Sequence, residues 1–262
     1  MITVMKLGGV NVGETALGKF TPSAAGAALA QIPEWKMFYD SEFYQNAAQS
    51  ILNRVNGNDT NFSGGSFNLV EGPPKLMRKA IASGGSVVHV GEHDINPEEW
   101  SFFIVLKPTY SATSADGFRF LRKTDDTGSQ SSIYLALSAS TRIMSIYRYA
   151  SGGTPRVQFT LPEGGALSDL AHPTILVFSF STRTGCAIRM NGKEVVRSTS
   201  AAGKETVESG LSAGSWDLFR NANGDYYNWG GFNIDITLPE NSNYLDSLEQ
   251  YFMNKYSIPV MP

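Results

Sequence analysis

Residues 174–197, TILVFSFSTRTGCAIRMNGKEVVR, constrain the fold more than any other part of the chain. Thr174–Ser181 is almost wholly apolar and rich in β-branched and aromatic residues, which is typical of a strand inside a β-sandwich. After a turn, Ala187–Met190 alternates between polar and apolar residues, and Asn191-Gly192 precedes the strand-like Lys193–Arg197. Asn-Gly is the strongest short hairpin signal, because both central residues of a type I′ turn need positive φ. The stretch therefore predicts three consecutive antiparallel strands.

Further runs of strand-like composition lie on both sides of this unit, separated by turns rich in Gly, Ser and Asp. Such regular spacing of short strands favours a two-sheet sandwich over an alternating βαβ fold. The last segment instead carries apolar residues at helical spacing from Leu245 to Tyr256, with Asn243 placed to cap the helix. Ile258-Pro259 is expected to end it. The predicted strands are Ser86–Val90, Trp100–Lys107, Gly117–Arg122, Ile133–Ser138, Ile143–Tyr149, Arg156–Leu161 and Trp229–Ile236.

Composition and charge limit the classes of function. The 262 residues are enough to bury a sizeable core without disulfides. A formal net charge of −3 gives no basic footprint for nucleic acid. No apolar run reaches the ~18 residues of a membrane helix, so no membrane partner is expected. The one cysteine, Cys186, excludes an internal disulfide, indicates folding in a reducing cytoplasm, and is expected to be a buried small hydrophobe.

Four segments together resemble the laminin-G-like members of the concanavalin A-like jelly-roll superfamily. They are WSFFIVLKP, ILVFSFSTRTGCAIRMNGKEV, WGGFNIDI and YLDSLEQYFMNKYSI. The segments WKMFYD and NGNDTNF look like the first strand and the polar turn that open such domains in bacterial and viral proteins. The resemblance implies an all-β, two-sheet antiparallel jelly-roll sandwich with a short C-terminal helix. Endings of this L…E…Y…KY-I type look like those of bacteriophage tail, fibre and head-decoration proteins.

The chain before Trp35 differs in composition from the rest. It includes TALGKFTPSAAGAALAQI, a small-residue run whose helical character Pro22 and Gly26 weaken. We expect an N-terminal arm over residues 1–33 that becomes ordered against sister subunits or other virion proteins, and a jelly-roll domain over residues 34–262. Charged residues make up only 17% of the chain, which suits a surface covered by neighbouring subunits. The alternative, in which the arm is an extra edge strand of the same sandwich, remains open.

Two segments resemble catalytic motifs, but one has the wrong predicted backbone conformation and the other lacks the required residues. The HVGEH string at 89–93 matches the H-x-x-E-H pattern of inverted zinc proteases, but its valines predict a strand. In a strand the two histidines would lie ~13 Å apart, too far to share one zinc ion. Some glycoside hydrolases of the jelly-roll superfamily carry E-x-D-x-x-E, whose glutamates flank the scissile bond. Because Asn233 and Leu238 occupy the glutamate positions and only Asp235 remains, no catalytic residue is predicted.

The segment Trp216–Trp229, WDLFRNANGDYYNW, reads as a loop and is the remaining candidate site. Its aromatic rings could stack on sugars, while its amides and carboxylates could hydrogen-bond sugar hydroxyls. Tyr226 and Tyr227 are adjacent, so one is expected to pack inward and leave the other for solvent or a sugar. Alternating side-chain oxygens could also bind Ca²⁺, but mostly neutral ligands predict poor affinity, and no cofactor is expected. The candidate glycan-binding residues are Trp216, Asn221, Asn223, Asp225, Tyr226 and Tyr227; a purely structural polar turn is the alternative.

These observations predict a non-enzymatic structural or adhesion protein of a bacteriophage virion, made in the host cytoplasm. Its expected partners are sister subunits and other virion proteins, with host surface polysaccharide as a candidate ligand. Two alternatives remain open: a polysaccharide-active glycoside hydrolase or lyase of the jelly-roll superfamily, and a soluble cellular lectin. A saccharide-release assay separates an enzyme from a binding protein, and a glycan array separates a binding protein from a scaffold.

Overall fold

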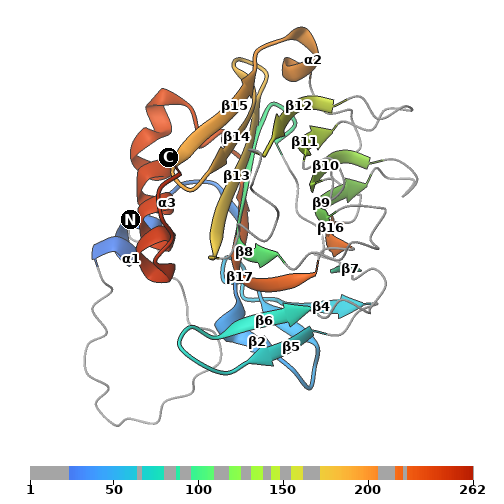
Figure 1. Ribbon diagram of the computed structural model, residues 1–262, viewed down its shortest axis with the longest axis vertical. Helices are drawn as coiled ribbons and strands as arrows, with labels where there is room; N and C mark the ends of the chain where they lie inside the picture. Colours follow the sequence, from blue (N-terminus) through green and yellow to red (C-terminus); the bar gives the residue numbers. More distant parts are fainter. Residues whose placement is uncertain are drawn as a thin grey trace.

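The structure, a computed structural model, confirms the predicted all-β sandwich (Figure 1). Its strands pair antiparallel, as in the hairpin between β13 (Thr174–Ser181) and β14 (Gly185–Met190). No helix in the described part of the chain is both long and apolar enough to span a bilayer. The described residues are 24–63, 67–79, 87–88, 96–108, 118–124, 131–137, 143–147, 155–161, 172–205, 216–220 and 223–261.

The larger sheet places the most apolar strand segments at its centre. Within the described residues its order is β15-β14-β13-β8-β17-β6-β5, and β1 also pairs with β17. All eight side chains of β13 are buried, which agrees with its nearly continuous apolar sequence. The other strands of this sheet are β1 (Trp35–Asp40), β5 (Phe67–Val70), β6 (Leu76–Lys79), β8 (Glu99–Pro108), β15 (Lys193–Ser198) and β17 (Gly224–Phe232).

A smaller sheet faces the larger one, in the order β12-β11-β10-β9-β16 (Figure 1). These strands are β9 (Phe118–Thr124), β10 (Ser131–Leu137), β11 (Ile143–Tyr147), β12 (Pro155–Thr160) and β16 (Trp216–Arg220). A further set of short strands was not predicted as a sheet and has the order β2-β3-β4-β7. These strands are β2 (Tyr44–Gln45), β3 (Ser50–Leu52), β4 (Asp59–Ser63) and β7 (Val87–Val88).

The Asn-Gly hairpin forms as predicted. Asn191 and Gly192 have φ values of 48° and 82°, the positive angles that a type I′ turn requires. The Asn191 side chain also accepts a hydrogen bond from the Ile175 backbone N–H at 3.0 Å, which ties the turn to the neighbouring strand. Cys186 is fully buried, as expected, and its thiol donates to the Gly203 carbonyl in α2 (Ala201–Lys204) at 3.3 Å. Burial raises the pKa of this thiol to about 11.

Side-chain alternation on the larger sheet produces three layers. Phe102 and Phe178 point into the inner core between the two sheets. Their neighbours Phe103 and Val177 point to the other side, into an outer core that Phe252 of α3 (Ser242–Tyr256) completes. Figure 1 shows α3 and α1 (Ala24–Leu29) covering the face of the larger sheet opposite the smaller sheet. The predicted C-terminal helix is therefore a packing element that seals one face of the sandwich.

The ends of α3 differ from their prediction at one residue. The helix begins at Ser242, so its N-cap is Asn241 rather than Asn243, and the Asn241 side chain makes no capping hydrogen bond. A 3₁₀ turn at Pro239–Asn241 leads into the helix and replaces the expected cap. The predicted end is confirmed, because Ser257 adopts a left-handed conformation and the Ile258 N–H donates to the Met253 carbonyl at 2.9 Å.

Part of the predicted arm packs against the domain. Leu29 and Ile32, at the end of α1, are buried in the outer core beside α3. The described part of the arm thus contributes to the sandwich rather than projecting from it. Residues 1–23 lie outside the described residues, so ordering of the arm by a partner remains a prediction.

Candidate functional site

The segment Trp216–Trp229 is not the loop that its composition predicted. Trp216–Arg220 is strand β16, where Trp216 pairs with Lys123 of β9. Gly224–Phe232 is strand β17, paired on one side with β8. Asn221 lies outside the described residues. The two strands belong to different sheets, so the predicted site residues do not share one flexible rim.

The expectation that Tyr226 or Tyr227 faces solvent is wrong. Their exposed fractions are 0% and 5%, because a register shift between Tyr226 and Asn228 breaks the alternation of β17. Tyr226 enters the inner core, whereas Tyr227 packs under α3, with its ring centroid 4.8 Å from that of Tyr256. Burial raises the pKa of both phenols above its usual value. Neither ring is available to stack on a sugar in this structure.

The predicted polar ligands Asp225 and Asn223 are also buried. Arg78 of β6 donates to both carboxylate oxygens of Asp225, at 2.6 and 2.9 Å. These hydrogen bonds raise the pKa of the Arg78 guanidinium. Asn223 is buried beside this strand. A calcium ion at Asp225 would have to displace a bidentate arginine, so the arrangement gives the weak calcium hypothesis no support.

Asp235, the remaining carboxylate of the hydrolase-like motif, lies in a turn after β17 and is fully buried. One of its oxygens accepts from the Thr237 N–H at 2.9 Å and from the Thr237 hydroxyl at 2.6 Å. The other accepts from the Thr184 hydroxyl at 3.3 Å. These contacts fix the turn, and they give Asp235 a structural role. The HVGEH string at 89–93 lies outside the described residues.

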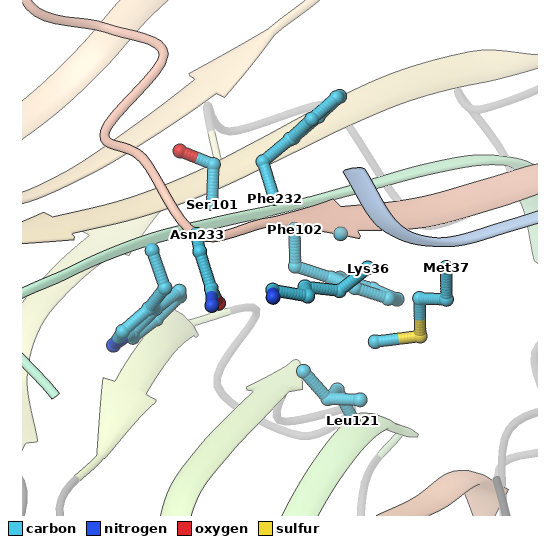
Figure 2. A pocket seen from close by; sticks show the side chains of 9 residues that line it. Lys36, Met37, Ser101, Phe102, Leu121, Phe232 and Asn233 are labelled. Carbon is cyan, nitrogen blue, oxygen red and sulfur yellow. The ribbon is translucent and has the colours of Figure 1, made fainter. Parts of the chain in front are cut away.

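A hollow that sequence reasoning missed opens between the two sheets. It lies where β1 and β8 begin and β17 ends, opposite β9, and it is small, with room for about one water molecule. In Figure 2, Ser101 and Phe232 point to the far side of the larger sheet, while Lys36 and Asn233 direct their polar ends toward the space above Leu121. Its apolar wall includes Met37, Trp100, Phe102 and Leu121, and its polar groups include Lys36 and Asn233.

A β-bulge places Lys36 in this hollow. Trp35 pairs with Phe232 and Met37 pairs with Gly231, so Lys36 is an extra residue between two successive pairs. Trp35 packs on the outer face, 4.1 Å from the Phe232 ring, and Met37 enters the inner core. Bulges of this kind redirect a side chain. The bulge turns Lys36 to the inner side, and no carboxylate of the described residues forms an ion pair with it.

The polar groups near Lys36 differ in whether they have hydrogen-bond partners. Trp100 is 2% exposed and its ring stacks near Phe180, yet its indole Nε1–H has no hydrogen-bond acceptor. Asn233 is held in place, because its side-chain oxygen accepts from the Asn96 N–H at 3.0 Å. Lys36 thus lies beside a largely apolar wall that includes Trp100. The residues that line the hollow include no Asp or Glu.

Comparison with known proteins identifies the fold. No protein-family model matches the sequence, and no curated protein sequence matches it. The binding domain of Paraclostridial Mosquitocidal Protein 1 is similar in structure, with a TM-score of 0.59 and 13% identity over 84% of this chain and 53% of that chain. Domain 4 of AbnA, a GH43 extracellular arabinanase from Geobacillus stearothermophilus solved in complex with arabinotriose, has a TM-score of 0.55 and 16% identity over 82% and 98%.

A third similar structure is that of botulinum neurotoxin type C, whose cell entry is described as dependent upon interaction with two ganglioside molecules. Its TM-score is 0.51 and its identity 13%, over 83% of this chain and 52% of that chain. The present chain therefore spans about half the length of the toxin chains that it matches. At these identities the likeness shows the fold alone, a β-sandwich shared with binding domains.

Proposed function

We propose that this chain is a non-enzymatic carbohydrate-binding module. The observation that carries the proposal is the likeness to domain 4 of the arabinanase, a module matched over 98% of its length and solved with arabinotriose bound. The likeness to botulinum neurotoxin type C, whose cell entry depends on gangliosides, also supports carbohydrate binding.

The chemistry of the described residues supports binding without catalysis. Retaining hydrolysis needs two carboxyl groups about 5 Å apart across the scissile bond, and inverting hydrolysis needs a somewhat wider pair. Asp235 is buried and accepts hydrogen bonds from Thr184 and Thr237. The positions of the two glutamates of the hydrolase motif are occupied by Asn233 and Leu238. A hydrolase or lyase of the same superfamily therefore remains the less favoured alternative.

A glycan array combined with a saccharide-release assay tests this proposal. The purified chain is expected to bind at least one class of glycan on the array and to release no reducing sugar from the polysaccharides that carry it. An empty array would refute carbohydrate binding and leave a scaffold. Release of sugar at a rate proportional to protein concentration would refute the non-enzymatic assignment.

We further propose that the module belongs to a bacteriophage virion, as a tail, fibre or head-decoration component that contacts sister subunits and other virion proteins. The support is the resemblance of the C-terminal segment to the endings of such proteins, together with a single buried cysteine suited to folding in host cytoplasm. Mass spectrometry of purified virions from the encoding phage should detect the chain in stoichiometric amounts. Its recovery only in a cellular fraction would favour the soluble lectin instead.

A further inference from the structure

We propose that Asn56 is a site of spontaneous covalent modification, at which the folded chain converts a side-chain amide to a carboxylate by deamidation. The inference goes beyond the proposed function and does not depend on it. Asparagine is a chemically labile residue, and a following glycine has no Cβ to hinder its backbone nitrogen. Local sequence makes three pairs of this kind equivalent, and the structure separates them. The pairs are Asn56-Gly57, Asn191-Gly192 and Asn223-Gly224.

The reaction joins the backbone nitrogen of Gly57 to the side-chain carbon Cγ of Asn56. The nitrogen gives up its proton to solvent base and forms a bond to Cγ, while the bond between Cγ and Nδ2 breaks and ammonia leaves with a proton from water. Solvent water then opens the resulting succinimide ring. Addition of water at Cγ gives an aspartate, and addition at the main-chain carbonyl gives an isoaspartate. The sum is one amide and one water converted to one carboxylate and one ammonium ion.

Asn56 lies in the loop between β3 and β4, where residues 55–59 are all exposed and solvent base and water have access. Its side-chain oxygen Oδ1 accepts a hydrogen bond from the Asn58 N–H at 3.0 Å. This bond holds the side chain beside the backbone that attacks it. The same N–H stabilises the negative charge that develops on Oδ1 when the Gly57 nitrogen adds to Cγ. The loop therefore provides both access and a donor for the charged intermediate.

One hydrogen bond opposes the attack, and it is local to the loop. The Gly57 N–H donates to the Asn53 carbonyl at 2.8 Å, so this bond must open before the nitrogen can reach Cγ. Hydrogen bonds in exposed loops open at a small cost in free energy compared with those of the core. A Cβ built on Gly57 would meet no atom of the described residues within 4 Å, apart from its chain neighbours. The Gly57 peptide thus has space to turn toward the Asn56 side chain.

The other two pairs are held in place by the sandwich. The Asn191 N–H donates to the Ile175 carbonyl at 3.0 Å, and the Asn191 Oδ1 accepts from the Ile175 N–H at 3.0 Å. The Asn191 carbonyl also accepts from the Met261 N–H at 3.1 Å. Asn223 is 7% exposed, and Gly224 is buried in β17 between β6 and β8. Ring closure at either pair would break contacts of the larger sheet, so both should react more slowly than Asn56.

Peptide mapping by mass spectrometry tests the ranking on the full chain, incubated at mildly alkaline pH with and without urea. Conversion is followed by the change in mass from amide to acid, and chromatography separates aspartate from isoaspartate. In the folded chain we expect the peptide that contains Asn56 to convert at least about tenfold faster than the other two, because only they require opening of the sheet. In urea the three peptides should convert at rates within roughly threefold of one another, because local sequence alone then decides.

Asn56→Gln and Asn58→Gln form a matched pair of variants in the same exposed loop. Asn56→Gln should abolish the rapid conversion, because its longer side chain would have to close a larger ring. Asn58→Gln should convert as the parent does, because it keeps the backbone N–H that donates to Asn56. A thermal melt checks that both variants fold. The assignment is overturned if Asn191 or Asn223 converts first in the folded chain, if all three convert alike there, if only the unfolded chain converts, or if rapid conversion persists in Asn56→Gln.

Discussion

Replacement of Asp235 distinguishes a structural carboxylate from a catalytic one. The side chain is fully buried and accepts hydrogen bonds from the Thr237 N–H, the Thr237 hydroxyl and the Thr184 hydroxyl. Hydrogen bonds to a charged group contribute about 1.5–3 kcal/mol each, with the long Thr184 bond at the lower end. Asp235→Asn keeps one oxygen for Thr237 but turns an amide toward Thr184, so we expect a loss of about 1–2 kcal/mol. Asp235→Ala leaves the Thr237 N–H without its acceptor and should cost about 3–5 kcal/mol.

Urea unfolding at pH 7 measures these losses, with saccharide release followed on the same samples. Asp246→Asn is the control, because Asp246 is an exposed residue of α3 and its replacement should change the free energy of unfolding by less than about 0.5 kcal/mol. Neither the parent nor Asp235→Asn is expected to release sugar. The reasoning is refuted if the parent hydrolyses a polysaccharide and Asp235→Asn abolishes that activity without loss of stability.

Three further predictions concern the packing of the larger sheet. Burial lowers the pKa of Lys79 from 10.5 to about 8. Between pH 8 and pH 10.5 the lysine is therefore protonated in the unfolded chain but neutral in the folded one, so the free energy of unfolding should rise by about 1–3 kcal/mol over this range. Urea titrations of Lys79→Met should lack this rise. Arg189 donates to both carboxylate oxygens of Glu249, at 2.9 and 2.8 Å, so Glu249→Ala should lower the free energy of unfolding by about 3 kcal/mol. The double variant Arg189→Met and Glu249→Leu should recover most of that stability. Additive losses from the two replacements would contradict the pairing. Gly230→Ala would place a Cβ 2.6 Å from the Met37 carbonyl oxygen, so the thermal midpoint should fall by several degrees, and an unchanged midpoint would show that the strands are not so close.

The parts of the fold that could be predicted are those whose signals are local. The hairpin at Asn191-Gly192 needed only positive φ at two adjacent residues, and β13 was recognisable from one uninterrupted apolar run. The amphipathic spacing of α3 likewise predicted its buried face. Each of these features is encoded within a few residues, so a single sequence is sufficient to find it.

The candidate site could not be predicted because its signals are non-local. The polar residues of Trp216–Trp229 suggested a loop, but Asp225 is neutralised by Arg78, 147 positions away, and Asn228 accepts from the Tyr256 hydroxyl of α3. Such partners allow a polar segment to be a buried strand. The bulge at Lys36 depends on its register against β17, which local composition does not report. A lone lysine within the apolar and aromatic run WKMFY was the one available signal.

The most direct test of the account is a crystal structure of the chain soaked with the glycan that binds it best on the array. The account predicts density for an intact saccharide bound to the sandwich. Crystals without bound saccharide at a saturating concentration, or density for a cleaved product, would contradict it.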